Sequence, residues 1–140
     1  MLFRSSTNIE PTFKDDTVAG DCEGMKVITR TWSLVDDCGN AAADQIQTIT
    51  VKDTIKPTFT APDNITIYTD ASCNYVATVD KTGDVTDEAD NCSTNINATF
   101  VDETEDGDCE GEKIITRTWS LVDNCGNRSE ERRVGKECRL

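Results

Sequence analysis

The strongest constraint on this chain is an internal repeat. Residues 6–40 align without a gap with residues 93–127, at an offset of 87, and 26 of the 35 aligned positions are identical. The longest shared run, Ile-Thr-Arg-Thr-Trp-Ser-Leu-Val-Asp, occupies residues 28–36 and 115–123. Identity this dense in a single frame indicates tandem duplication, so we expect serially copied modules rather than one unique fold.

The similarity ends abruptly on both sides. Residues 2–5 share nothing with residues 89–92, and residues 128–140 share nothing with residues 41–53, where a strand is expected to follow. Both flanks resemble translated sequencing adapter, so we exclude them from fold reasoning. The expected organisation is an artefactual flank at 1–5, the C-terminal part of one repeat at 6–52, the next repeat without its last strand at 53–127, and an artefactual flank at 128–140.

The composition excludes several classes of function. Acidic side chains number 27 against 14 basic ones, the formal net charge is −13, and histidine is absent. Nucleic-acid binding needs clustered cations, and without histidine the chain has neither a Ser-His or Cys-His pair nor the commonest zinc ligand. No stretch approaches the roughly 20 apolar residues of a membrane span. We therefore expect no nucleic-acid partner, no membrane insertion and no enzyme activity.

The secondary structure is predicted to be strand. Short runs rich in Thr, Val and Ile alternate with period two and are bounded by Asp, Asn, Gly and Pro, as in residues 46–51, 64–68 and 75–79. Within the repeat, Ile115, Trp119 and Leu121 fall on one face of a strand at 113–122. Short strands at this spacing favour an all-β sandwich.

Trp119, and Trp32 in the first copy, are the predicted core anchors, since each lies beside Ile and Leu rather than alone on a polar face. Arg30 and Arg117 share the inward phase. We expect each to reach the sandwich edge or to pair with a carboxylate, because an unpaired buried charge is costly.

A turn closes the repeated segment. The sequences Asp-Asp-Cys-Gly-Asn at 36–40 and Asp-Asn-Cys-Gly-Asn at 123–127 consist of residues that tolerate turn dihedrals. In the first copy the chain then returns as residues 41–51, which completes a hairpin. The second copy lacks this return, so an open edge along 113–122 is expected to make the protein poorly soluble or prone to strand exchange.

These motifs together resemble a known family. The linker at 53–57, the strand at 64–67, the Asp-Asn-Cys motif at 90–92 and the hairpin at 121–127 are similar to hyalin-repeat (HYR) and related immunoglobulin-like modules, particularly those in tandem arrays of surface adhesins of gliding bacteria. The resemblance implies truncated immunoglobulin-like β-sandwich repeats at the cell surface, with neighbouring repeats of the same chain as partners.

The cysteines also favour an extracellular location. Six cysteines lie between residues 6 and 127, with no Cys-x-x-Cys pair, which is typical of a disulfide framework. Cys109 and Cys125 bracket one strand and so cannot meet unless that strand is broken. Because successive strands alternate direction, we predict Cys73–Cys109 and Cys92–Cys125 bonds and expect Cys22 and Cys38 to be unpaired by truncation.

Acidic loops suggest one ligand, because calcium prefers carboxylate oxygens. The candidate calcium residues are Asp53, Asp84, Asp87 and Asp90, although acidic loops usually just solvate a secreted surface. A carboxylate pair for glycoside hydrolysis has no defined pocket in the sequence.

Two functions remain open. One is a stalk or spacer that extends a binding domain away from the cell, and the other is a module that itself binds a glycan or a cell-surface protein. Near-identical repeats and an aromatic content of only 6% favour the spacer.

Overall fold

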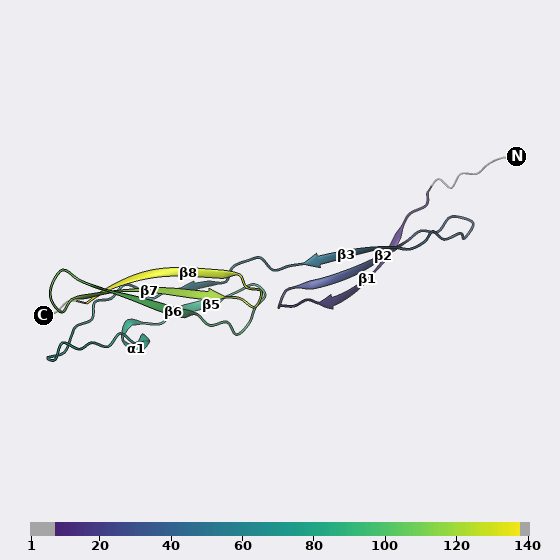
Figure 1. Cartoon of the computed structure of the whole chain (residues 1–140). Coiled ribbons are helices and arrows are strands. Elements are labelled where there is room, and N and C mark those ends of the chain that lie inside the picture. The colour runs from purple at the N-terminus through teal and green to yellow at the C-terminus, as the bar shows by residue number, and fades with distance from the viewer. Residues whose placement is uncertain (1–7, 138–140) are drawn as a thin grey trace. The chain divides into compact units, whose positions relative to one another are not determined.

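The protein is built from strands in three antiparallel sheets (Figure 1). The computed structural model describes the backbone of residues 8–137 and the side chains as far as residue 134. Among these residues, helix is limited to one short turn, α1 (Val79–Thr82). The expected all-β class is therefore confirmed, while the flank predicted at residues 1–5 lies outside the described residues.

Backbone contacts divide the chain into two units, one ending at Asp53 and the other beginning at Thr54. Unit 1 contains a single sheet in which the central strand pairs with an antiparallel neighbour on each side. Its strands, in sheet order, are β1 (Thr12–Ala19), β2 (Lys26–Ser33) and β3 (Gln45–Val51).

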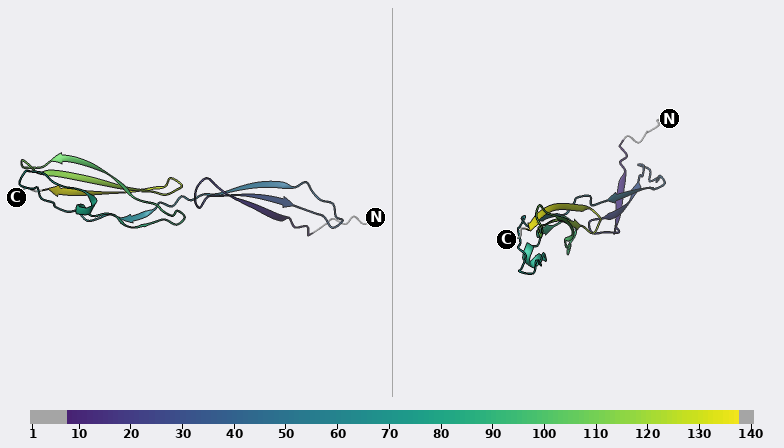
Figure 2. Two further views of the ribbon diagram at one scale, coloured as in Figure 1. Left: turned by 90° about the horizontal axis from the view of Figure 1, so that it is seen from below. Right: turned by 60° about the vertical axis from the view of Figure 1, so that its left-hand side comes forward.

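Unit 2 contains a larger sheet of the same order and a small two-stranded sheet. The larger sheet consists of β6 (Thr99–Asp106), β7 (Lys113–Val122) and β8 (Arg128–Glu137), and the smaller one of β4 (Thr58–Thr60) and β5 (Thr86–Ala89). The segment that carries β4 and α1, teal in Figure 2, runs along one face of the green-to-yellow β6–β7–β8 sheet. This segment forms a second layer over that sheet, here called the covering layer.

The repeated sequence produces the same strand pairing in both units. Phe13 lies opposite Trp32 across β1 and β2, and Phe100 lies opposite Trp119 across β6 and β7. Both pairings are antiparallel and run without a bulge over eight positions. The strand predicted at 113–122 is confirmed with those bounds, and the one at 46–51 lies within β3.

The hydrophobic core of the described residues lies in unit 2. Ile115, Trp119 and Leu121 are buried on one face of β7, as their alternation predicts, and Trp119 is only 2% exposed. Trp32 occupies the equivalent position in unit 1 but is half-buried. The difference follows from the covering layer, which unit 2 has on the inward face of its sheet.

Two predicted strands are wrong. Residues 64–68 and 75–78 join no sheet, and Val79 begins the turn of α1. Ile65 and Ile67 instead direct their side chains toward the face of the larger sheet, where they line a cavity. Period-two alternation shows which side chains face inward, but it does not show whether the backbone finds a ladder partner.

The edge expected to be open along 113–122 is occupied by β8, which pairs with β7 over ten positions. The strand is held from its other side as well, since the Ser129 hydroxyl donates to the Pro57 carbonyl and the Val134 N–H donates to Asn64 Oδ1. A β-ladder joins backbone groups, so residues 128–137 can fill this place without sharing the sequence of β3.

Candidate functional site

Arg117 connects the sheet of unit 2 to its covering layer. Its Nε and Nη2 donate to the two carboxylate oxygens of Asp102 on β6, each at 2.7 Å. Nη1 donates to Thr82 Oγ1, and Nη2 also donates to the Ala77 carbonyl, again at 2.7 Å. The residue is 7% exposed, so its charge is buried but neutralised by a bidentate carboxylate and supported by two further acceptors.

Aromatic rings complete the surroundings of this guanidinium. Its Cζ lies 4.0 Å from the ring centroid of Phe100 and 5.9 Å from that of Trp119. The two rings are 4.9 Å apart and tilted by 59°. A cation over an aromatic face gains electrostatic attraction, so the whole cluster is internally satisfied and leaves little of Arg117 available for a ligand.

Unit 1 contains the same cluster at the positions 87 residues earlier. Arg30 Nε lies 2.7 Å from Asp15 Oδ1, and its guanidinium lies 3.9 Å from the Phe13 ring centroid and 5.7 Å from that of Trp32. The hydrogen bond from Arg30 lowers the pKa of Asp15 and raises that of Arg30. The prediction that each inward arginine pairs with a carboxylate is confirmed.

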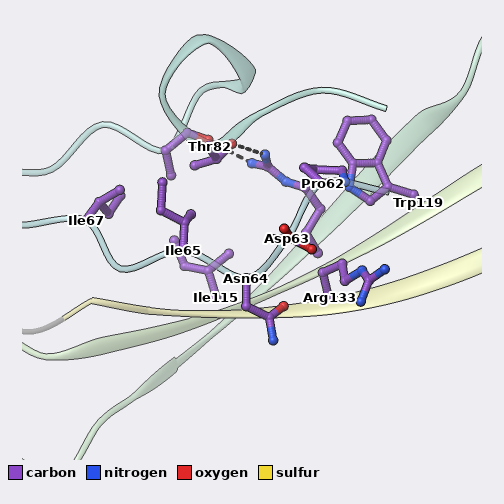
Figure 3. A pocket seen from close by; sticks show the side chains of 11 residues that line it. Pro62, Asp63, Asn64, Ile65, Ile67, Thr82, Ile115, Trp119 and Arg133 are labelled. Carbon is purple, nitrogen blue, oxygen red and sulfur yellow. Dashed lines mark hydrogen bonds between the residues drawn. The ribbon is translucent and has the colours of Figure 1, made fainter. Parts of the chain in front are cut away.

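A cavity of about 50 Å³ lies between the larger sheet of unit 2 and its covering layer. Figure 3 shows Ile65, Ile67 and Ile115 toward one end and Trp119 and Arg133 toward the other. The Arg117 guanidinium and Thr82 form part of its wall. Its remaining lining residues are Pro62, Asp63, Asn64 and Ala77.

The cavity is suited to an apolar group rather than to chemistry. Its volume exceeds that of a single water but is far below the several hundred Å³ of a typical small-molecule site. Among its lining residues Arg117 is engaged with Asp102, and none is a cysteine or a serine. The cavity therefore offers space for a side chain.

Three turns share one construction, in which an aspartate caps the asparagine four residues later. Asp36 Oδ1 accepts from the Cys38 and Asn40 N–H groups at 2.9 and 2.8 Å, and Oδ2 accepts from Asn40 Nδ2 at 2.9 Å. Asp123 makes the equivalent bonds to Cys125 and Asn127, and Asp70 caps Ser72 and Asn74 by backbone N–H groups. Two of these turns join β2 to β3 and β7 to β8.

The fourth residue of each turn has a left-handed backbone. Gly39 and Gly126 have φ of 85° and 88°, and Cys73 takes the same place in the third turn with φ of 65°. Glycine adopts this conformation without steric cost. Cys73 is therefore in a strained position for a residue with a side chain.

The four described aspartates predicted to bind calcium do not form a single cluster. Asp84 Oδ1 accepts from the Val85 N–H, and Asp87 Oδ2 accepts from the Thr86 hydroxyl. Within the described part of the chain, neither Asp84 nor Asp87 belongs to a group of three metal-ligating side chains. Asp53 is the last residue of unit 1.

Asp90 lies in different surroundings. Its Oδ2 accepts from the Cys92 and Ser93 N–H groups at 2.9 and 2.7 Å, while its buried Oδ1 has no hydrogen-bond partner. A carboxylate oxygen of Asp123 lies within 4.8 Å. The sequence does not predict Asp123 as a metal ligand, although it is the first residue of the repeated turn at 123–127.

The arrangement of the cysteines differs from the expected one. Cys22 and Cys125 each take part in a disulfide, whereas Cys38 and Cys73 are exposed thiols. The predicted Cys73–Cys109 bond is therefore not formed, and the Cys109 thiol points to Glu112 Oε2 at 3.6 Å.

The predicted Cys92–Cys125 bond is not formed either. Cys92 carries a thiol whose sulfur accepts from Asn91 Nδ2 at 3.0 Å, and the sulfur of Cys125 is already used in a disulfide. Cys22, expected to be unpaired, is bonded. Cysteine positions alone do not specify which sulfur atoms meet.

A search against known protein families found no match, and neither did a search of curated proteins. None of the described helical residues forms a segment of the length and apolarity that a membrane crossing requires.

The sequence predicted that each arginine pairs with a carboxylate, but it did not identify Asp15 and Asp102 as the carboxylates. Asp102 and Asp15 occupy matched positions in the two copies, so the repeat itself contains the signal. The Asp-x-x-x-Asn spacing at 36–40, 70–74 and 123–127 is likewise visible in the sequence. The contacts of Arg117 with Thr82 and Ala77 have no counterpart in the alignment, because both residues lie outside the aligned segment 93–127.

Removing the carboxylate partner of Arg117 tests the cluster. Asp102→Ala leaves a buried guanidinium without its counter-charge and should lower the free energy of unfolding of unit 2 by about 3 kcal/mol. The matched control is Asp15→Ala in unit 1, where the ion pair is more exposed and the loss should be smaller. Amide hydrogen exchange of β7 and β2 measures the two units separately, and equal effects would contradict the argument.

The left-handed turn position gives a second prediction. Gly126→Ala adds a Cβ that meets nothing within 4 Å, so its cost of about 1 kcal/mol is a backbone cost alone. Cys73→Gly should change stability in the opposite direction, since it relieves the same strain. Urea denaturation of both variants checks the pair, and an unchanged midpoint for Gly126→Ala would show that the backbone at 126 is not constrained.

The pH dependence of unit 2 gives a third prediction. Burial raises the pKa of Asp123, but the hydrogen bonds from the Asn127 side chain and from the Asn127, Cys125 and Gly126 N–H groups together lower it below its usual value. Asp123 therefore contributes stability above its ordinary pKa of about 3.9, and this contribution is lost as the pH falls through the lower folded-state pKa.

Asp123→Asn should reduce the free energy of unfolding at pH 7. The variant should then lose less stability than the parent chain does when the pH is lowered. Urea denaturation followed through Trp119 fluorescence, in a Trp32→Phe background, measures unit 2 at each pH. Exposed Asp108→Asn is the control and should keep the pH profile of the parent chain. Parallel profiles for all three proteins would exclude the role given to Asp123.

Proposed function

We propose that the chain is an extracellular structural and adhesion module of tandem immunoglobulin-like repeats, which acts as a stalk or spacer in a large cell-surface protein. The observation that carries the proposal is the reuse of one internal cluster. The Arg-Asp-Phe-Trp set has the same 2.7 Å ion-pair distance in both units, and its ring distances differ by 0.2 Å or less.

This reuse favours a mechanical role over a chemical one. The repeated residues contact one another within the sheet, where they stabilise the pairing of β1 with β2 and of β6 with β7. A duplicated binding or catalytic site would instead repeat side chains at an accessible surface. Modules that stabilise themselves in this way can be added in series.

Two further features support an extracellular location. The chain contains an intramolecular disulfide, which persists in oxidising compartments. Its net charge of −13 favours solubility at an exposed surface. The resemblance to hyalin-repeat modules agrees with both.

The alternative is a module that binds a glycan or a cell-surface protein and is stabilised by calcium. The buried Asp90 Oδ1 without a hydrogen-bond partner, with Asp123 within 4.8 Å, is the observation that favours calcium. Titration calorimetry with calcium chloride, before and after chelation by EDTA, tests this alternative. Binding heat that the parent chain shows and the Asp90→Asn variant lacks would support this alternative.

Single-molecule pulling from the two chain ends tests the spacer directly. We expect cooperative unfolding events under force, and we expect reduction to lengthen the chain released, because a disulfide keeps the enclosed residues from extending. Cys125→Ser should give the released length of the reduced chain without reductant. Featureless extension of the oxidised protein would count against a mechanical role.

A glycan array separates the two functions. The spacer predicts no selective binding by the fluorescently labelled chain. Selective capture of one glycan class, abolished by a substitution of exposed residues, would favour the binding module instead.

A further inference from the structure

The two larger sheets differ at one strand. β3 pairs with β2, and β8 pairs with β7 at the equivalent edge, but the inward-facing residues of β3 and β8 differ from each other. Opposite Ile28, Arg30 and Trp32 of β2, the strand β3 places Ile49, Gln47 and Gln45. Opposite Ile115, Arg117 and Trp119 of β7, the strand β8 places Gly135, Arg133 and Glu131.

The first consequence concerns the indole N–H. In unit 1, Trp32 Nε1 donates to Gln47 Oε1 at 3.1 Å. In unit 2, Trp119 Nε1 is buried and has no hydrogen-bond partner. Leaving such a donor unsatisfied costs more than the bond itself contributes. β8 therefore lacks an acceptor that β3 provides.

The second consequence concerns charge. Arg117 lies directly opposite Arg133, whereas Arg30 lies opposite the neutral Gln47. Like charges directly opposite on one sheet face are destabilising. The Nε of Arg133 is also buried without a hydrogen-bond partner. The Arg133 Nη2 lies 3.2 Å from Glu131 Oε1, so the side chain keeps one ion pair while its Nε is unsatisfied and its charge lies opposite Arg117.

The third consequence concerns volume. Ile115 lines the cavity of unit 2 and lies opposite Gly135, which has no side chain. Directly opposite residues share one face of a sheet. Ile28 in unit 1 lies opposite Ile49, so an isoleucine at the place of Gly135 would project toward the Ile65, Ile67 and Ile115 end of the cavity.

We infer that the edge of β7 is a binding site for a strand of the β3 type, donated by another copy of the repeat, and that β8 is the exchangeable occupant of that site. The incoming strand carries Gln opposite Arg117 and Ile opposite Ile115. The glutamine of the incoming strand accepts a hydrogen bond from the Trp119 indole N–H and replaces the charge opposite Arg117. Its isoleucine fills the cavity. The β2–β3 pair of unit 1 is the observed example of the same pairing.

A synthetic peptide of residues 43–53 with a fluorescent label tests this site on the intact 140-residue chain. Fluorescence polarisation should show saturable binding. A control peptide with Gln47→Arg and Ile49→Gly should bind at least about ten-fold more weakly. Equal binding of the two peptides, or no binding of either, would overturn the inference.

Amide hydrogen exchange identifies the place of binding. The peptide should accelerate exchange of residues 128–134 while β7 stays protected, because β8 must leave for the peptide to pair. Binding that leaves β8 protected would place the peptide elsewhere and also refute the inference.

A chain variant provides the reciprocal test. Arg133→Gln combined with Gly135→Ile gives β8 the two β3 residues, so β8 should hold the edge and peptide affinity should fall at least about ten-fold. Arg132→Gln combined with Lys136→Gln changes the neighbouring positions and should bind as the parent chain does. If the first variant fails to fold, the comparison of the two peptides on the parent chain still decides the question.

Discussion

The burial of a positive charge inside a sheet governs this structure. Arg117 can be buried because its guanidinium donates hydrogen bonds to both carboxylate oxygens of Asp102. It also donates to the Thr82 hydroxyl and the Ala77 carbonyl. Breaking such a pair costs far more than an exposed ion pair contributes. The register of β6 on β7 and the position of the covering layer are therefore linked through one side chain.

The same constraint explains what the repeat preserves. In the sheet of unit 2, Asp102 lies directly opposite Arg117 on the adjacent strand, and the ring of Phe100 that stacks on the guanidinium lies two positions along. Asp15, Phe13 and Arg30 have the same arrangement in unit 1. In each unit the duplicated residues thus satisfy one another within a single pair of strands.

The sequence predicted what periodicity and duplication can encode. It indicated an all-β chain, the bounds of β7 and the burial of Trp119, because those depend on local alternation. It did not predict that residues 64–68 stay outside a ladder, that residues 128–137 pair with β7, or which cysteines bond. Each of these depends on which distant backbone or sulfur is nearby, and a single sequence contains little of that information.

The aspartate-capped turns have a consequence for how the protein acquires its structure. Because Asp123 and Asn127 are four residues apart, the β7–β8 hairpin closes through contacts that are local in sequence. Hairpins of this kind form within microseconds, whereas pairings of high contact order are slow. The Asp36–Asn40 turn is equally local, so the β2–β3 hairpin can nucleate as the polypeptide emerges from the ribosome, before β7 has been synthesised.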